Sequence, residues 1–221
     1  MSSENGGPLS RELVLEAALY LADRQGIESL SMRRLAAELS VKAMSLYNHV
    51  QNKEDILDGI TDMVVAEIGV PDPGDHWKTA MRHRAMSAHE VLLRHEWSTM
   101  ELLSRVNVGP AMLRYVDATI GCLLNAGFSL EAADHAWNAI DSHIYGFTLQ
   151  ELNFPFEAAE YRDAAQAYLP QLPAGTYPHI YRMTQHIIAG EYDGLHDFGF
   201  GLEIILDGLE RMLTTHGRRK T

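Results

Sequence analysis

Four cationic side chains lie close together near the start of an otherwise acidic chain. The 221 residues carry a formal net charge of −12, but residues 31–53 carry +3 (four cations minus Glu38). Residues 1–30 contribute −3 (2 − 5), and residues 54–221 contribute the remaining −12. Cationic groups bind phosphate, so this distribution is typical of a protein with one small nucleic-acid-binding face. Chance clustering is the alternative, and charge alone does not decide between them. The four cations are Arg33, Arg34, Lys42 and Lys53.

The spacing of apolar residues indicates that helices position these cations. Gly26 is placed to end the first helix, and Ser31 and Asn52 are placed to cap the second and the fourth. Only Ser40-Val41 separates the second helix from the third. This spacing fits a helix-turn-helix, whose second member enters the major groove of DNA. A helical pair with a short turn is also common in all-α proteins without DNA binding, and the spacing alone does not decide between them. The predicted helices are 10–25, 31–39, 42–49 and 52–68.

Proline and glycine interrupt the chain at Pro71–Gly74, and we place a domain boundary there. The following segments again show helical spacing, whereas the proline-containing stretch 153–176 is predicted to be irregular. Nothing indicates a strand, so the predicted fold class is all-α. The later helices are predicted at 76–95, 97–106, 110–126, 129–152, 177–189 and 198–213.

Several functional classes lack their sequence signals. No apolar run is long enough to span a membrane, and the first eight residues do not resemble a signal peptide. The lone Cys122 fits a reducing compartment, so a cytoplasmic location is expected. The eleven histidines form no His-Glu-x-x-His motif, and no paired cysteines or phosphate-binding glycine loop occurs. We therefore predict no metal, no cofactor and no enzymatic activity.

Residues 26–57 resemble the DNA-binding signature of the tetracycline-repressor (TetR) family. The most specific part is Ser45-Leu-Tyr-Asn-His-Val-x-Asn-Lys-Glu-x-x-Leu57. Farther on, 126–131 and 198–210 resemble the tetracycline-repressor type of C-terminal domain. The resemblance implies a bacterial homodimeric repressor that binds a near-palindromic double-stranded DNA operator and is released by a small-molecule effector. In this family the operator half-sites lie about 34–36 Å apart.

The resemblance also implies a domain organisation. A three-helix helix-turn-helix domain is expected to be joined by a connecting helix to a larger helical ligand-binding and dimerisation domain. The expected boundaries are a flexible arm at 1–8, the DNA-binding domain with its connecting helix at 9–70, the ligand-binding and dimerisation domain at 71–216 and a basic tail at 217–221.

The resemblance assigns DNA-contacting roles of the family to individual positions of this sequence. Arg33 matches a second-helix position that reaches DNA, and its guanidinium suits a bidentate contact with guanine. Residues 43–45 occupy the front of the recognition helix, whereas Tyr47, His49 and Lys53 match phosphate-binding positions. The alternatives to phosphate binding are that Tyr47 is a half-buried core residue and that His49 is a solvated surface residue. Ser40 replaces the glycine usual at the turn, so a conformational penalty is expected there. The predicted DNA-binding residues are Arg33, Lys42, Ala43, Met44, Ser45, Tyr47, His49 and Lys53.

The resemblance places an effector cavity among the helices of 76–152. A small apolar or amphipathic effector is expected, although residues of these types are more often plain core than ligand contacts. Tetracycline is not predicted, since Gly69 stands where a family histidine reaches the drug. The predicted effector-binding residues are Trp97, Met100, Leu103, Met112, Tyr115, Thr119, Trp137, Asp141 and His143.

Helices 129–152 and 198–213 match those through which the family dimerises, with an internal core as the alternative. The predicted interface residues are Trp137, Ile140, Ile144, Phe147, Leu202, Ile205, Leu209 and Met212. A different reading of the whole chain is a helical ligand- or protein-binding module without DNA binding, which its acidic character favours.

Overall fold

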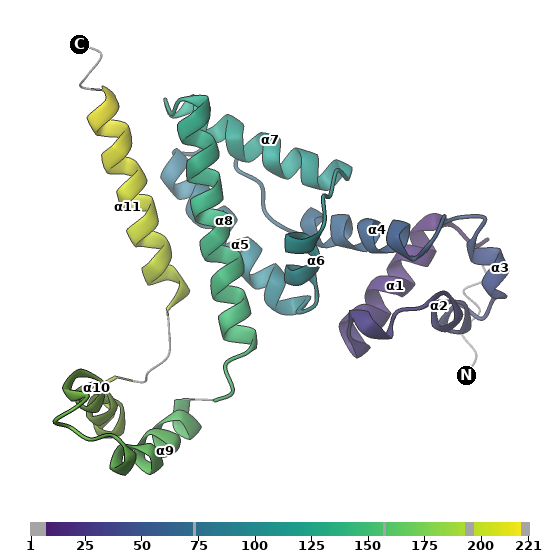
Figure 1. The fold of residues 1–221 in the computed structure, drawn as a ribbon. Helices are drawn as coiled ribbons and strands as arrows, with labels where there is room; N and C mark the ends of the chain where they lie inside the picture. Colours follow the sequence, from purple (N-terminus) through teal and green to yellow (C-terminus); the bar gives the residue numbers. More distant parts are fainter. Residues whose placement is uncertain (1–7, 73, 157, 193–196, 218–221) are drawn as a thin grey trace. The chain divides into compact units, whose positions relative to one another are not determined.

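A computed structural model of the chain describes residues 8–72, 74–156, 158–192 and 197–217. Within these ranges every regular element is a helix, as the sequence predicts (Figure 1). Most of the expected arm at 1–8 and of the basic tail at 217–221 lies outside the described residues. The α-helices are α1 (Arg11–Gln25), α2 (Met32–Glu38), α3 (Ala43–Leu46), α4 (Lys53–Ala66), α5 (Trp77–Arg94), α6 (Ser98–Ser104), α7 (Pro110–Asn125), α8 (Leu130–Leu152), α9 (Ala158–Tyr168), α10 (Pro178–Ala189) and α11 (Phe198–Gly217).

Local capping explains where the first helices begin and end. The Ser31 hydroxyl accepts a hydrogen bond from the backbone of Arg34 in α2, and Asn52 accepts one of 2.9 Å from the backbone of Asp55 in α4. Gly26 follows α1 with φ 77°, a conformation that costs a glycine little. These caps confirm the predicted ends, because each depends on residues only a few positions apart.

The α1–α3 unit packs around an apolar centre that includes Leu35 and Leu46, both fully buried. Ser40, in the turn between α2 and α3, has φ 54°, which confirms the expected strain of a non-glycine residue there. The predicted third helix is too long. The structure ends α3 at Leu46, and the N–H groups of Asn48 and His49 bond three residues back rather than four. The chain thus tightens into a turn before α4.

Helix α4 connects the DNA-binding unit to the following helices. It packs against α1 on one side and against α5, α6 and α7 on the other. The Asp62 carboxylate of α4 accepts hydrogen bonds from the backbone N–H groups of Ala111 (3.2 Å) and Met112 (2.9 Å), at the start of α7. A carboxylate satisfies otherwise unpaired donors at a helix N-terminus and opposes the helix dipole. α4 and α7 are therefore tied together directly.

The described residues divide by their contacts into two compact units. One extends to Leu152 and resumes at Leu202, and the other covers 153–201. In the smaller unit, the rings of Phe154, Phe156 and Tyr161 contact one another, and Gly190 ends α10 in the left-handed conformation. The expectation of an irregular 153–176 is wrong, because α9 occupies much of it. Alanine-rich α9 forms through high helix propensity rather than a broad buried stripe. The boundary predicted at 71 stays a prediction.

Candidate functional site

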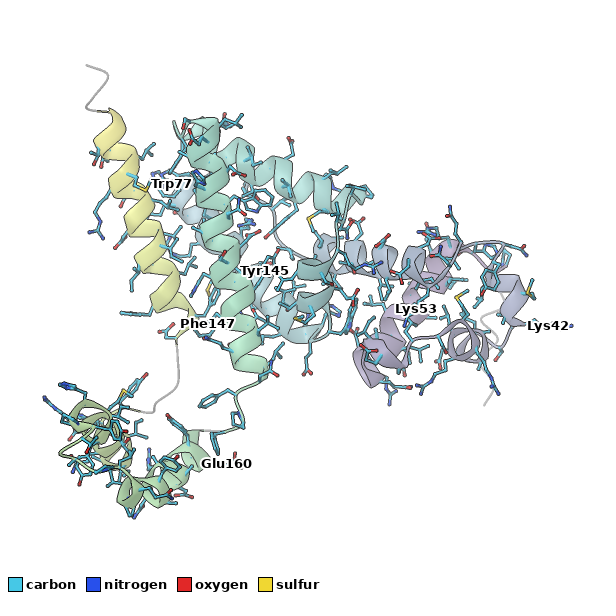
Figure 2. All side chains as sticks on the ribbon, viewed as in Figure 1. Lys42, Lys53, Trp77, Tyr145, Phe147 and Glu160 are labelled. Atoms are coloured by element: carbon cyan, nitrogen blue, oxygen red, sulfur yellow. The ribbon has the colours of Figure 1, made fainter. Side chains whose placement is uncertain are left out.

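The α1–α3 unit and the start of α4 carry cations that form no ion pair with another described side chain. Within the described residues, Arg33, Lys42 and Lys53 form no ion pair and donate no side-chain hydrogen bond, whereas Arg34 donates to Gln25 and to the Ser29 carbonyl. Figure 2 shows Lys42 at the outer end of this unit. Uncommitted cations around a recognition helix can bind phosphate without first breaking a protein contact.

The residues of the recognition segment divide by burial. Leu46 and Val50 face inward and are buried, whereas Met44 and Tyr47 are exposed, by 75% and 48% respectively. Ala43, Ser45 and His49 are half-buried, and Arg33 and Lys42 are exposed. The predicted DNA-binding residues therefore lie on one segment and its flanks, with their side chains at least partly accessible. The exposure of Tyr47 disfavours the alternative that it is a core residue.

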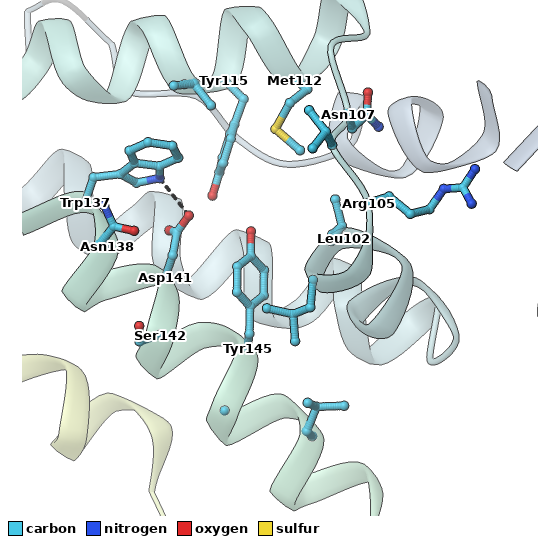
Figure 3. A pocket seen from close by; sticks show the side chains of 15 residues that line it. Leu102, Arg105, Asn107, Met112, Tyr115, Trp137, Asn138, Asp141, Ser142 and Tyr145 are labelled. Atoms are coloured by element: carbon cyan, nitrogen blue, oxygen red, sulfur yellow. Dashed lines mark hydrogen bonds between the residues drawn. The ribbon is translucent and has the colours of Figure 1, made fainter. Parts of the chain in front are cut away.

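A cavity of about 620 Å³ lies between α7, α8 and the segment that follows α6. Figure 3 shows Tyr115, Asp141 and Tyr145 turned toward one another in it. Of the nine predicted effector-binding residues, the cavity is lined by Leu103, Met112, Tyr115, Trp137 and Asp141.

The remaining four predicted residues lie elsewhere. Trp97 donates a 2.8 Å hydrogen bond to Asp23 of α1, and Thr119 is fully buried and bonds to the Tyr115 carbonyl. Met100 is largely exposed, and half-buried His143 packs its ring on Phe147. The structure therefore does not bring these four side chains into the cavity.

A buried ion pair supports the polar wall of the cavity. The Arg84 side chain of α5 is fully buried, and its Nη2 donates to Asp141 Oδ1 at 2.5 Å. Asp141 Oδ2 accepts a 2.7 Å hydrogen bond from Trp137 Nε1. The Arg84 guanidinium also stacks 4.4 Å from the centre of the Tyr115 ring, a cation–π arrangement. These contacts hold Asp141 and Trp137 in fixed orientations.

Both cavity tyrosines are protonated hydrogen-bonding groups at neutral pH. Burial, followed by the charge of Asp141, raises the pKa of Tyr145, and burial likewise raises the pKa of Tyr115 above its usual range. Asn107 Nδ2 is buried at the cavity without a hydrogen-bond partner among the described residues. The cavity thus combines apolar walls with phenol groups, which suits a mainly apolar ligand with a few polar atoms.

Sequence reasoning missed several residues at this site, among them Tyr145, Arg84, Arg105 and Asn107. Tyr145 follows Asp141 by four residues and Trp137 by eight, so the helical period could have identified it. Arg84 and Asn107 carried no such signal, since their place depends on how α5 and the segment after α6 pack.

The predicted dimer residues fall into two groups. Four of them are buried within the single chain and are therefore unavailable to a partner; these are Ile140, Ile144, Leu202 and Leu209. Trp137, Phe147 and Ile205 are half-buried, and Met212 is 49% exposed. Ile204 and Gly208 precede Met212 at four-residue intervals, and Ile204 is 58% exposed. α11 therefore presents an accessible apolar stripe beside the buried one.

None of the helices that the structure describes combines the length and apolar character needed to cross a membrane. Among the described residues, no group of three or more His, Cys, Asp or Glu side chains is arranged to hold a metal ion.

The fold and these two sites define a helical DNA-binding regulator with a ligand cavity. Residues 14–60 match the model of bacterial regulatory proteins of the tetR family, and residues 70–213 match that of the tetracyclin repressor-like C-terminal domain. The chain belongs to the tetR family, and it is a ligand-responsive, DNA-binding transcriptional repressor.

Individual relatives agree with this assignment. The chain is 32% identical over 214 residues to the transcriptional repressor DrrR1 of Streptomyces coeruleorubidus, covering 91% of this chain and 77% of that protein. It is 30% identical over 213 residues to the class D tetracycline repressor of Escherichia coli, covering 93% and 91%. The solved structure of Streptomyces coelicolor ActR in complex with actinorhodin matches with a TM-score of 0.78 and 30% identity, covering 94% and 99%.

Proposed function

We propose that the chain acts as a cytoplasmic homodimer that represses transcription from a near-palindromic operator, without a catalytic step of its own. The accessible, uncommitted cations Arg33, Lys42 and Lys53 around the recognition segment are the observation that carries this proposal. Lys42 and Lys53 bind phosphates and orient the segment 43–49 in the major groove, where Arg33 contacts a guanine. The strongly acidic remainder of the chain keeps other faces away from DNA.

The proposed effector is a small apolar or amphipathic molecule that occupies the cavity at Tyr115, Trp137 and Tyr145. The apolar and aromatic lining of the cavity supports this. ActR, of similar fold, has been solved with actinorhodin and with (S)-DNPA bound. These two compounds are therefore the first ligands to test.

Effector binding is proposed to act on DNA through α4. Arg105 lines the cavity and bonds to Glu54 and Asp58 in the first two turns of α4. Met112 also lines the cavity, and its N–H is held by Asp62 farther along the same helix. A ligand that displaces either residue moves α4, and with it the recognition segment, which lowers operator affinity.

The proposed dimer contact includes Ile204 and Met212 on α11. Changing both to Asp is expected to convert the dimer to a monomer in sedimentation experiments, because two charges then oppose burial of the stripe. Leu113→Asp on α7, which likewise places a charge at an exposed apolar residue, is the control and should remain dimeric. A native chain that sediments as a monomer at all micromolar concentrations contradicts this part of the proposal.

Selection of binding sites from random duplex DNA tests the central proposal. The native chain is compared at moderate salt with an Arg33→Ala/Tyr47→Ala double variant, whose substitutions are at exposed positions. Recovery of a near-palindrome by the native chain alone supports a repressor that reads DNA through this surface. If neither protein recovers a sequence, with or without the candidate ligands, a helical binding module without DNA binding becomes the better explanation.

A further inference from the structure

Met44 is an apolar side chain placed on a cationic surface. It is 75% exposed, whereas Leu46 two residues later is fully buried in the α1–α3 unit. Contact with another apolar group would remove this exposed side chain from water, and such burial lowers the free energy of the complex. The neighbouring uncommitted cations Arg33, Lys42 and Lys53 make a nucleic acid the complementary partner.

The chemistry of α3 narrows what Met44 can contact. The four residues of this helix are Ala43, Met44, Ser45 and Leu46. None of them carries the guanidinium, amide or carboxylate with which side chains read guanine, adenine or cytosine by paired hydrogen bonds. The one apolar group that a base presents in the major groove is the 5-methyl of thymine. An exposed thioether beside an alanine therefore matches thymine better than any other base.

We propose that Met44 is a specificity-determining residue that selects thymine at one position of each operator half-site through contact with the 5-methyl group. The inference rests on the proposed DNA-binding function and adds the identity and chemistry of one base contact. Specificity for guanine then falls to Arg33, outside α3. Because the operator is read by two chains, the thymine occurs as a symmetric pair.

Replacing thymine with deoxyuridine tests this contact, because the two bases differ only by the methyl group. In the operator selected by the native chain, each symmetric thymine pair is replaced in turn, and affinity is measured at fixed salt. Burial of one methyl corresponds to about a fourfold change in affinity, so loss of two should weaken native binding about fifteenfold at one pair. The Met44→Ala variant should bind the thymine and deoxyuridine operators equally, whereas Met44→Leu should retain discrimination.

Met86→Ala is the matched control, since Met86 is also an exposed methionine but lies on α5. This variant should lose as much affinity as the native chain when the same thymine pair is replaced with deoxyuridine. The proposal is overturned if native binding is insensitive to every methyl removed, or if Met44→Ala retains the native penalty. Either result leaves operator binding itself intact. Failure to select any operator instead removes the DNA-binding function, and this inference with it.

Discussion

Arg105 Nη2 lies 2.6 Å from Glu54 Oε2, so a side chain that lines the cavity is bonded to the first turn of α4. Asp58, one turn later, accepts a second hydrogen bond of 3.0 Å from the same nitrogen. Glu54 and Asp58 do not line the cavity themselves. They can therefore be changed without altering the walls that a ligand contacts.

The double variant Glu54→Gln/Asp58→Asn should separate ligand binding from DNA release. Ligand affinity is expected to stay near the native value, and the ligand-induced drop in operator affinity to shrink about tenfold, a loss of about 1.4 kcal/mol of coupling. Both carboxylates are more than half exposed, so the free energy of unfolding should fall by less than about 1 kcal/mol. If the ligand still lowers operator affinity by the native amount, another contact, such as that of Asp62 with α7, couples the cavity to α4.

Arg33 and Arg34 should differ sharply in operator binding although they are adjacent. Arg33→Ala is expected to lower specific affinity by about 1–3 kcal/mol and to relax selectivity at one base. Arg34→Ala should affect binding much less, because its guanidinium is already bonded to Gln25 and Ser29. Gel-shift titrations with the selected operator measure both. Equal losses for the two variants would contradict the assignment of Arg33.

Gly109 is predicted to be required for the contact between α4 and α7. A Cβ atom at Gly109 would lie 2.3 Å from Asp62 Cγ, so Gly109→Ala forces this carboxylate away from the N-terminus of α7. Loss of such a cap costs about 1–2 kcal/mol of unfolding free energy, measurable by urea titration. Gly121→Ala, inside α7 with open space around the new Cβ, should instead stabilise by about 0.5–1 kcal/mol. If both variants lose stability, the cause is a general sensitivity of α7 to substitution and not the contact between Gly109 and Asp62.

The Arg11–Asp55 ion pair should stabilise the DNA-binding unit in a pH-dependent way. The hydrogen bond from Arg11 lowers the pKa of Asp55 below its usual 3.8, and its partner atoms lie 2.6 Å apart. A depressed folded-state pKa contributes stability above the unfolded pKa, and this contribution disappears as pH falls through the folded value.

The native chain should therefore exceed Asp55→Ala in stability at neutral pH, by about 1 kcal/mol, and this difference should disappear as pH falls through the lowered pKa of Asp55. Thermal unfolding between pH 7 and pH 3 provides the comparison. A gap between native and Asp55→Ala that stays constant with pH would assign the stabilisation to something other than this ion pair.

Local features of the fold were accessible from the sequence. The caps at Ser31 and Asn52 and the ending at Gly26 were correctly predicted, since each involves groups within a few residues. The same local reasoning extended the third helix to 49 and overlooked α9. In the first case a tight turn follows Leu46, and in the second the helix buries too little to produce an apolar stripe.

The cavity illustrates the limit of such reasoning. Trp137 and Asp141 were both predicted to line the cavity from the family resemblance, and in the structure Trp137 Nε1 donates a hydrogen bond to Asp141 one turn later on α8. Ile140 was predicted to lie at the dimer interface, with its own core as the alternative, but the structure buries it within the chain. The apolar pattern does not separate the two, since both environments select the same kind of residue.

The sequence by itself thus determined the helical class, the helix-turn-helix and the cationic residues beside it, because short-range spacing and composition encode them. Only the tertiary structure placed Arg84 behind Asp141, 57 positions apart, and Arg105 against Glu54, 51 positions apart. Such pairs form only when separate helices pack at a particular angle and register. That geometry depends on the shape of the whole core rather than on any local pattern.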